Sequence, residues 1–360
     1  MNAKQEFFPI TVSAAHTVKE ERTSEMKKAK IFQRTLALTL AAVMLVMVAS
    51  CGKNEKYTEA ETHPEMEYPK LSEKRYNADG ELVSEDLYEY DADGHLVSRK
   101  YTIYNMNEMG LSGLSTETGR EAVGKYEYEN DRLSKFTFHE TYSGSGYEED
   151  SVYSYAYDTN GLVKEIKRTA NGKYTGKTSY MRDGSGKVKR MIYYNESGGF
   201  NGMIEHKYDA SGRCVEEKEY DTQSTKIRYI YRYDQSGNLT EWVSFGGESG
   251  TLTHRYTYGS GGELLQESVT DGDGDEYCVI EYAYDEAGRK KSKTWNNYEE
   301  ESFTVTEYDE YDDNGNCLKI SVYDEKHALF CRYEYEYGSE KVQRMGWELQ
   351  GNRFHSDFLL

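Results

Sequence analysis

Proline is nearly missing from this chain, and its distribution is informative. The three prolines, Pro9, Pro64 and Pro69, all precede residue 70, so every later residue carries a backbone N–H group. A proline in a central strand would remove a hydrogen bond from the sheet. The region after residue 70 can therefore form a long, uninterrupted sheet.

An excess of positive charge is also missing. The 44 lysines and arginines stand against 64 aspartates and glutamates, which gives a formal net charge of −20. A nucleic acid partner requires clustered cations that neutralise its phosphates. We therefore expect no nucleic acid partner, and we interpret the interleaved charges as a solvated surface.

Recognisable catalytic motifs are missing as well. The sequence has no Gly-x-Ser-x-Gly motif, and its histidines are scattered without a pair at metal-ligand spacing. The glycine-rich stretch at 259–262 lies in a predicted hairpin turn with no helix after it, which argues against a phosphate-binding loop. We expect a protein that is not an enzyme and uses no cofactor.

Long hydrophobic runs are limited to one near the N-terminus. The 13 residues Leu36–Val48 are mostly apolar and follow a basic stretch, as in a signal peptide, and they are too short to cross a bilayer comfortably. The run ends in Val48-Ala49-Ser50-Cys51, which resembles a bacterial lipobox. The resemblance implies cleavage before Cys51, lipid on its thiol, and attachment to the extracytoplasmic side of the bacterial cell membrane. An ordinary secretory signal and an uncleaved anchor are the alternatives.

These features divide the chain into five segments. Residues 1–25 precede a better start at Met26 and are expected to be a disordered leader or a mis-called start. Residues 26–50 form a helical lipoprotein signal peptide. Residues 51–70 are polar and contain two prolines, so they predict a flexible tether after the lipidated cysteine. Residues 71–345 carry a repeat, and 346–360 form a C-terminal cap.

The repeat has a period of 25–27 residues from Tyr157 to Tyr337. Most units contain Tyr-Asp-x-x-Gly or a close variant. Asp at the first turn position and Gly at the fourth predict a type I turn followed by a bulge. Alternating tyrosines predict strands with their rings on one face. A second, more varied set of turn signals lies midway, so we expect a strand reversal about every 12–13 residues.

The predicted fold class is therefore all-β, with roughly twenty antiparallel strands. Open twisted sheets rarely exceed about 10 strands without curling, so we expect tandem hairpins in a long, curved or spiralling sheet. The strings "YDADGHLV", "YDASGRCV" and "YDQSGNLT" resemble YD repeats of Rhs-type bacterial proteins and teneurins. That resemblance implies a sheet that spirals into a shell. The chain lacks the proline-containing core motif of Rhs proteins, which favours a short curved sheet over an enclosed chamber.

One acidic stretch resembles the start of a calcium loop. Asp271, Asp273 and Asp275 alternate in "DGDGD", a spacing that lets carboxylates converge on one cation. The sixth loop position is Glu276 instead of glycine, and the twelfth is Tyr282 instead of a bidentate acid. We therefore favour an acidic hairpin tip and keep the three aspartates as a weak metal candidate.

Four cysteines follow Cys51. Cys214 and Cys317 occupy positions where other units have leucine, which favours a role as small apolar core residues. Cys317 and Cys331 lie on strands that flank one turn, so an exported protein could join them in a disulfide.

Three hypotheses for function follow. The leading one is a lipid-anchored, extracytoplasmic, non-catalytic binding or scaffolding protein with a carbohydrate or protein ligand. Trp242 and Trp295, with the varied turns, are the candidate ligand contacts because aromatic rings can stack on sugars or apolar groups. The second is an Rhs-related shell or toxin-accessory component. The third is a cell-envelope enzyme.

Overall fold

The computed structural model describes residues 66–105, 119–221, 224–247, 250–298 and 301–343. The expected leader, the signal peptide, Cys51 and the expected C-terminal cap lie outside these residues. The described part consists of strands and turns, and it holds no helix long and apolar enough to cross a membrane.

Twenty of the 22 strands form one sheet, and two short ones form a separate ribbon. The ribbon consists of β1 (Met66–Glu67) and β22 (Val342–Gln343). The sheet consists of β2 (Lys70–Asn77), β3 (Leu82–Tyr90), β4 (Leu96–Ile103), β5 (Gly119–Glu129), β6 (Arg132–Ser143), β7 (Glu148–Tyr157), β8 (Val163–Ala170), β9 (Lys173–Arg182), β10 (Val188–Asn195), β11 (Phe200–Tyr208), β12 (Cys214–Tyr220), β13 (Thr225–Tyr233), β14 (Leu239–Gly247), β15 (Gly250–Tyr258), β16 (Leu264–Thr270), β17 (Glu276–Tyr284), β18 (Lys290–Asn297), β19 (Ser302–Tyr311), β20 (Cys317–Tyr323) and β21 (Leu329–Tyr337).

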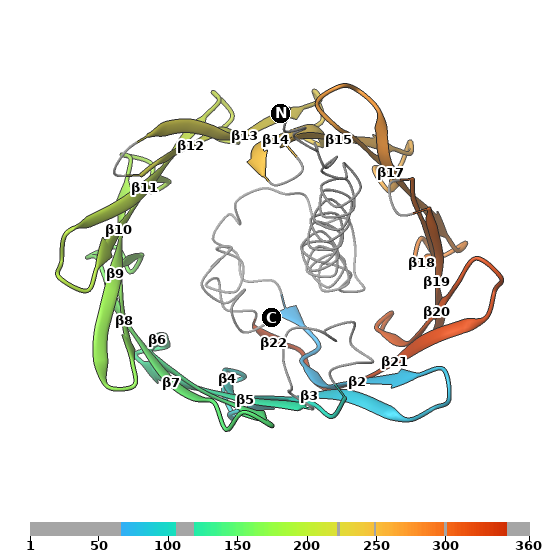
Figure 1. Ribbon diagram of the computed structural model, residues 1–360, viewed down its shortest axis with the longest axis horizontal. Coiled ribbons are helices and arrows are strands. Elements are labelled where there is room, and N and C mark those ends of the chain that lie inside the picture. Colours follow the sequence, from blue (N-terminus) through green and yellow to red (C-terminus); the bar gives the residue numbers. More distant parts are fainter. Residues whose placement is uncertain (1–65, 106–118, 222–223, 248–249, 299–300, 344–360) are drawn as a thin grey trace, which may run out of the picture. The chain divides into compact units, whose positions relative to one another are not determined.

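The sheet closes into a barrel (Figure 1). Each strand pairs antiparallel with the next, and β21 pairs back with β2, where Tyr333 lies opposite Arg75. The predictions of an all-β fold and of antiparallel hairpins are confirmed. The prediction of an open, spiralling sheet is wrong, because the first and last long strands satisfy each other's edges.

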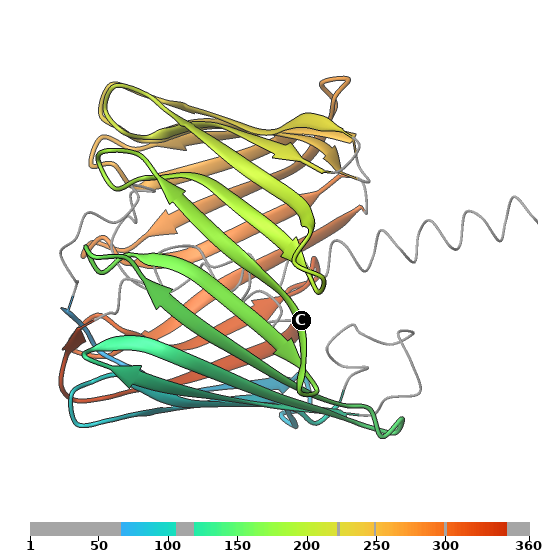
Figure 2. The same ribbon diagram turned by 90° about the vertical axis from the view of Figure 1, so that its left-hand side faces the viewer.

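Hairpin turns gather at the two ends of the barrel (Figure 2). The turns between β3 and β4 and between β7 and β8 lie at one end of the barrel. Every second turn after them, such as the β9–β10 and β11–β12 turns, lies at the same end, which we call the Asp-x-x-Gly rim. In the first of them, Gly94 N donates to Asp91 O at 3.1 Å, Asp91 N donates to His95 O at 2.9 Å, and Gly94 has φ +86°. This confirms a type I turn closed by a left-handed glycine.

The other end, the opposite rim, is less irregular than its sequence suggested. The turns at 77–80, 195–198, 271–274 and 324–327 form the same pair of backbone hydrogen bonds as the Asp-x-x-Gly turns. Tyr76 therefore belongs to an opposite-rim hairpin, although its sequence matches the other set. This explains the short spacing of 14 residues between Tyr76 and Tyr90.

A β-bulge accompanies the hairpins of the Asp-x-x-Gly rim. Tyr90 pairs with Leu96 while Glu89 pairs with Ser98, which leaves Val97 without an opposite residue. The same shift recurs in the β7–β8, β11–β12, β13–β14, β15–β16, β17–β18 and β19–β20 pairs. A bulge bends its strand and increases the local twist. Repeated around the sheet, it supplies the curvature that closure needs.

The two faces of the wall differ in burial. One face holds a cluster that includes Tyr126 (7% exposed), Phe136 (2%) and Tyr153 (5%), with half-buried tyrosines around it. Burial raises the pKa of Tyr155 and Tyr180 on this face. Side chains on the inner face of a closed barrel converge, whereas those on the outer face diverge. We therefore assign the aromatic face to the interior and call it the inner wall.

The outer face carries ion pairs between neighbouring strands. Examples are Lys74–Glu85 at 3.3 Å, Lys100–Glu121 at 2.7 Å, Lys177–Glu165 at 2.6 Å and Arg190–Glu205 at 2.7 Å. Their side chains are exposed or half-buried, so the outer face suits contact with water.

The β1–β22 ribbon lies at the Asp-x-x-Gly rim. The Tyr68 hydroxyl donates to Asn314 Oδ1 at 2.9 Å, and Val342 lies against the backbone of Gly94. Figure 1 shows the ribbon inside the ring of strands. The described chain therefore enters and leaves the barrel at the same end.

Candidate ligand site on the inner wall

Trp242 stands at the centre of an aromatic cluster on the inner wall. Strand register places it opposite Tyr231 on β13 and opposite His254 on β15. Its ring centroid lies 4.2 Å from that of His254 and 5.6 Å from that of Tyr229. These rings come from three adjacent strands, so they form one continuous aromatic surface.

Two buried carboxylates border this surface. Glu267 is 7% exposed, and its Oε1 lies 2.8 Å from His254 Nδ1. Glu217 is 8% exposed and accepts a hydrogen bond from the Tyr231 hydroxyl at 2.9 Å. A buried carboxylate is costly unless it is hydrogen-bonded, so these partners hold both acids in fixed positions beside the rings.

The indole N–H of Trp242 is buried and has no hydrogen-bond acceptor among the described residues. Buried donors in native proteins are normally satisfied by protein, water or ligand. The cluster thus combines flat aromatic faces, an unsatisfied donor and two fixed acceptors. Such a set can stack on the C–H face of a sugar ring and exchange hydrogen bonds with its hydroxyls.

Trp295, the second tryptophan proposed from sequence, also faces the inner wall. It lies opposite Ile280 on β17, next to Cys278. Strands β14 and β18 are four steps apart, or about 19 Å at the usual strand spacing. The structure therefore does not bring Trp242 and Trp295 into one site.

The residues around Trp242 were not singled out in the sequence. Tyr231 could have been found, because the turn at 234–237 fixes which residue of β14 lies opposite it. His254 could not, because its pairing with Trp242 depends on the β14–β15 hairpin, whose sequence has no Asp-x-x-Gly turn. Glu267 could not, because the β15–β16 turn lacks the aspartate.

Cys278 does not provide a nucleophile. Burial raises the pKa of its thiol to about 11, against a smaller opposing contribution from the Trp295 indole. The thiolate is the reactive form of cysteine, so this side chain stays protonated and unreactive near neutral pH.

The predicted Cys317–Cys331 disulfide is not formed. All four cysteines within the described residues are free thiols. Cys331 lies opposite Val322, five residues along β20 from Cys317, a separation of about 16 Å at the usual strand rise. A disulfide requires Cα atoms within about 7 Å, so adjacent strands are not sufficient.

The aspartates of the predicted calcium loop serve the turn itself. Asp271 Oδ1 accepts backbone N–H groups from Asp273 at 3.0 Å and Asp275 at 2.9 Å. Among the described residues, the carboxylates of Asp271, Asp273 and Asp275 are not close enough together to bind one metal ion as a group of three. The acidic hairpin tip is therefore the better interpretation.

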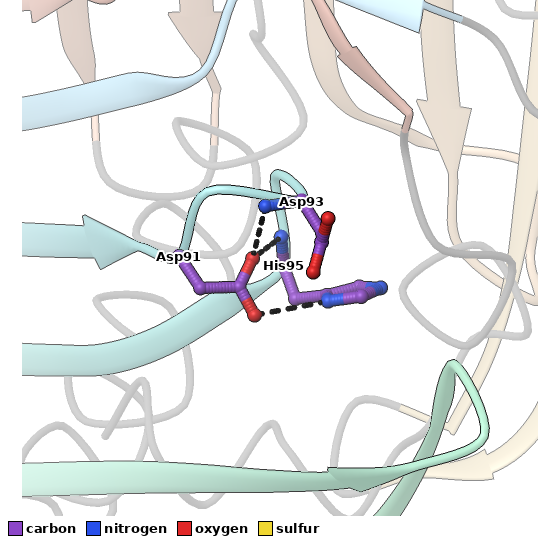
Figure 3. A group of neighbouring side chains, drawn as sticks. All are labelled: Asp91, Asp93 and His95. Atoms are coloured by element: carbon purple, nitrogen blue, oxygen red, sulfur yellow. Dashed lines mark hydrogen bonds and ion pairs between the residues drawn. The ribbon is translucent and has the colours of Figure 1, made fainter.

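Two other clusters do bring possible metal ligands together. The first is Asp91, Asp93 and His95 (Figure 3). The second is His139, Glu148 and Asp150, at the outer surface of β6 and β7. Both lie largely at the exposed surface, where acidic groups commonly gather without a metal.

The first cluster has a structural explanation. His95 Nδ1 lies 3.0 Å from Asp91 Oδ2, and the His95 ring stacks on Tyr128 at 4.6 Å. Partial burial disfavours the ionised Asp91, but hydrogen bonds from His95 outweigh it and lower the pKa of the carboxyl.

Two other units hold an arginine at the same position, with the same kinds of contact. Arg213 donates to Asp209 and lies over Tyr233, and Arg289 donates to Asp285 and lies over Tyr311. His95 thus fills a repeated structural position, and we assign no metal to it.

Known proteins give limited comparisons. No protein-family model matches the chain, and no curated protein matches it. A porin-like protein from Bacteroides uniformis is 11% identical, with 77% of this chain and 100% of that chain covered and a TM-score of 0.35. A porin-like protein from Bacteroides vulgatus is 12% identical, with 74% and 98% covered and a TM-score of 0.20. A DUF1329 family protein from Desulfovibrio piger is 10% identical, with 79% and 88% covered and a TM-score of 0.17.

The barrel corrects the expected family. Its closure contradicts the spiralling YD-repeat sheet that the resemblance to Rhs-type proteins implied. The likeness is too low to transfer a function.

Proposed function

We propose that this protein is a lipid-anchored, extracytoplasmic, non-catalytic binding protein whose inner wall takes an uncharged carbohydrate. The observation that carries the proposal is the cluster of Trp242, Tyr229 and His254 beside Glu217 and Glu267. Aromatic faces bind the apolar side of a sugar. The fixed carboxylates accept from its hydroxyls, and the indole N–H donates to an oxygen.

The outer face supports an aqueous setting for the wall. Ion pairs such as Lys100–Glu121 and Arg190–Glu205 occupy the strands themselves and not only the turns. An arginine or lysine on a lipid-facing strand costs about 2–4 kcal/mol at the bilayer midplane. A barrel that carries many of them is better placed in water beside a membrane than across one.

The lipobox-like sequence supports the anchor. Cys51→Ala should abolish lipid attachment and leave the protein uncleaved or released, because the acylated thiol is lost. Globomycin sensitivity and partitioning into the detergent phase would test this. Unchanged processing of the variant would refute the anchor without affecting the binding proposal.

The binding proposal is tested with the chain from Gly52, which keeps every described residue. We expect a neutral oligosaccharide to be captured from a glycan array, and isothermal titration to show at least tenfold weaker binding for Trp242→Ala. Trp295→Ala is the matched control, since it removes the same side chain from the same face four strands away. Glu267→Gln should also weaken binding, because a neutral amide is a weaker hydrogen-bond acceptor than a carboxylate for a ligand hydroxyl.

Two outcomes would contradict the proposal. One is the absence of any glycan ligand across the array. The other is equal loss of affinity in Trp242→Ala and Trp295→Ala, which would mean that the substitutions act on the barrel as a whole.

A further inference from the structure

Exposed large apolar side chains are unevenly distributed between the two ends of the barrel. The described residues contain eleven of them, and eight lie at the opposite rim. Seven of these eight are aromatic residues, and they lie on six hairpins or strand ends. We call them the aromatic rim: Tyr104, Tyr147, Tyr174, Phe200, Tyr298, Phe303 and Phe330.

The aromatic rim extends along more than half of the barrel's circumference, with a gap at the β2–β3 hairpin. Its residues follow the order of neighbouring strands, from the β18–β19 turn through β21 and β4 to the start of β11. The most exposed are Phe330 (57%), Tyr104 (50%) and Tyr147 (49%). The rings therefore lie at one end of the barrel and are spread over six hairpins or strand ends.

Turn geometry does not explain this exposure. The β10–β11 and β20–β21 hairpins, which carry Phe200 and Phe330, use the same turn as the Asp-x-x-Gly rim. The exposed large apolar residues described at the Asp-x-x-Gly rim are Met181 and Leu265. Both ends have comparable numbers of hairpins, so the aromatics are a property of one rim. Clustered exposed apolar groups usually mark an interaction site.

We propose that the aromatic rim rests in the headgroup region of a lipid bilayer. The rings lie on several hairpins around one end of the barrel. An extended flat surface could contact all of them at once, whereas a compact protein partner would contact only some of them. Tyrosine combines an apolar ring with a polar tip and favours the interface between lipid and water. This proposal is independent of the carbohydrate site.

The position of the predicted anchor is compatible with this orientation. The described chain begins at Met66, at the Asp-x-x-Gly rim, 15 residues after Cys51. An extended chain of that length spans about 50 Å. A strand of nine residues is about 30 Å long and the barrel wall is shorter still, because strands tilt. The tether can therefore reach past the wall to a membrane at the aromatic rim.

Charge selects the kind of lipid. The hairpins of the aromatic rim also carry carboxylates, among them Glu148, which follows Tyr147, and Glu325 in the β20–β21 turn. Anionic headgroups would repel them. The structure therefore favours zwitterionic lipid, and added anionic lipid should weaken the contact.

Vesicle co-sedimentation of the chain from Gly52 tests the proposal, because this chain lacks the anchor. We expect binding to phosphatidylcholine vesicles and at least tenfold weaker binding for Tyr147→Ser/Tyr174→Ser/Phe200→Ser. The control, Leu87→Ser/Met181→Ser/Leu265→Ser, removes three exposed apolar side chains elsewhere and should bind as the parent does. Vesicles with added phosphatidylglycerol should bind less.

Circular dichroism and thermal melting must first show that both triple variants are folded. If the rim variant does not fold, the single variants Tyr147→Ser and Phe200→Ser each replace it, with a smaller expected loss. Failure of the parent to bind zwitterionic vesicles would overturn the proposal. So would equal losses in the rim and control variants, or capture of a protein by the rim without vesicle binding. Retained glycan binding by the rim variant would separate this result from the inner-wall proposal.

Discussion

The turn tyrosines stabilise the hairpin that precedes them in the barrel. The Tyr233 hydroxyl donates to the carbonyl of Cys214 at 2.9 Å, and the Tyr258 hydroxyl donates to that of Leu239 at 2.9 Å. Each acceptor belongs to the residue just before a bulge, where the regular ladder is interrupted. Equivalent bonds come from Tyr128, Tyr157, Tyr208, Tyr284 and Tyr311. The repeated tyrosine thus links one hairpin to the next.

Arg182 shows that the hydrogen bond matters more than the aromatic ring. It occupies the tyrosine position of its unit, and its Nη2 donates to the carbonyl of Val163 at 3.2 Å. That carbonyl again precedes a bulge. A guanidinium has the length and the donors needed to replace a phenol.

Tyr233→Phe should lower the free energy of unfolding by about 1–2 kcal/mol, because it leaves a carbonyl without its donor. Chemical denaturation measures this. Tyr220→Phe is the control, since its hydroxyl donates to Glu205 on the outer face, where water can replace it. If both variants lowered the free energy of unfolding equally, the hydrogen bond between hairpins would contribute no more to stability than the exposed one.

At the level of the hairpin, one glycine sets the chain reversal. Gly237 has φ +90°, and a Cβ placed there would lie 3.9 Å from the nearest side-chain atom, Arg213 Nη1. Space is therefore available, and the backbone angle alone accounts for the glycine.

Gly237→Val should be more destabilising than Ser236→Val by about 1–2 kcal/mol, because a β-branched residue is strained in the left-handed region. Melting temperatures of the two single variants would measure the difference. A Ser236→Val variant that is as unstable as Gly237→Val would indicate that crowding, not φ, governs the turn.

At the scale of the whole molecule, the pairing of β2 with β21 closes the barrel. Lys74 and Glu334 lie opposite each other on the outer face of these strands. Paired residues on neighbouring antiparallel strands have Cβ atoms about 4.5–5.5 Å apart, close to disulfide range. In an open spiral they would be at opposite ends of the sheet.

Lys74→Cys/Glu334→Cys should therefore form a disulfide under mild oxidation, and mass spectrometry of the digested protein would detect the linked peptides. Lys74→Cys/Lys207→Cys should not cross-link, because residue 207 lies on β11, far around the barrel from β2. Failure of the 74–334 pair to link, with both thiols shown to be accessible, would argue against closure.

The inner wall should also make the barrel sensitive to alkaline pH. Burial raises the pKa of Tyr142 and Tyr233 from 10.0 to about 12. A raised folded-state pKa contributes stability that is complete below about pH 10 and is lost as the pH rises toward 12. Tyrosinate absorbance and circular dichroism should change together in this range. Full ionisation of these tyrosines at pH 10 with an intact barrel would contradict the burial.

Local features of this protein followed from the sequence by itself. The Asp-x-x-Gly turns, the strand reversals, the antiparallel hairpins and the tyrosine face depend on backbone angles and on a period of two, which neighbouring residues determine. Trp242 could be proposed as a ligand contact because of its residue type. The hypothesis for Cys51 also rests on local sequence and awaits its test.

Tertiary structure decided whether the sheet spirals or closes, because closure depends on the curvature summed over twenty strands and on a pairing between residues 260 positions apart, Lys74 and Glu334. The Asp-x-x-Gly signal predicts a bulge at single hairpins, but it does not determine how far the bends add up around the sheet. Strand register then placed His254 and Glu267 beside Trp242 and kept Trp295 and the Cys317–Cys331 pair apart. The pairing of residues between neighbouring strands is set when the whole sheet assembles. The site around Trp242 could therefore be identified only from the structure.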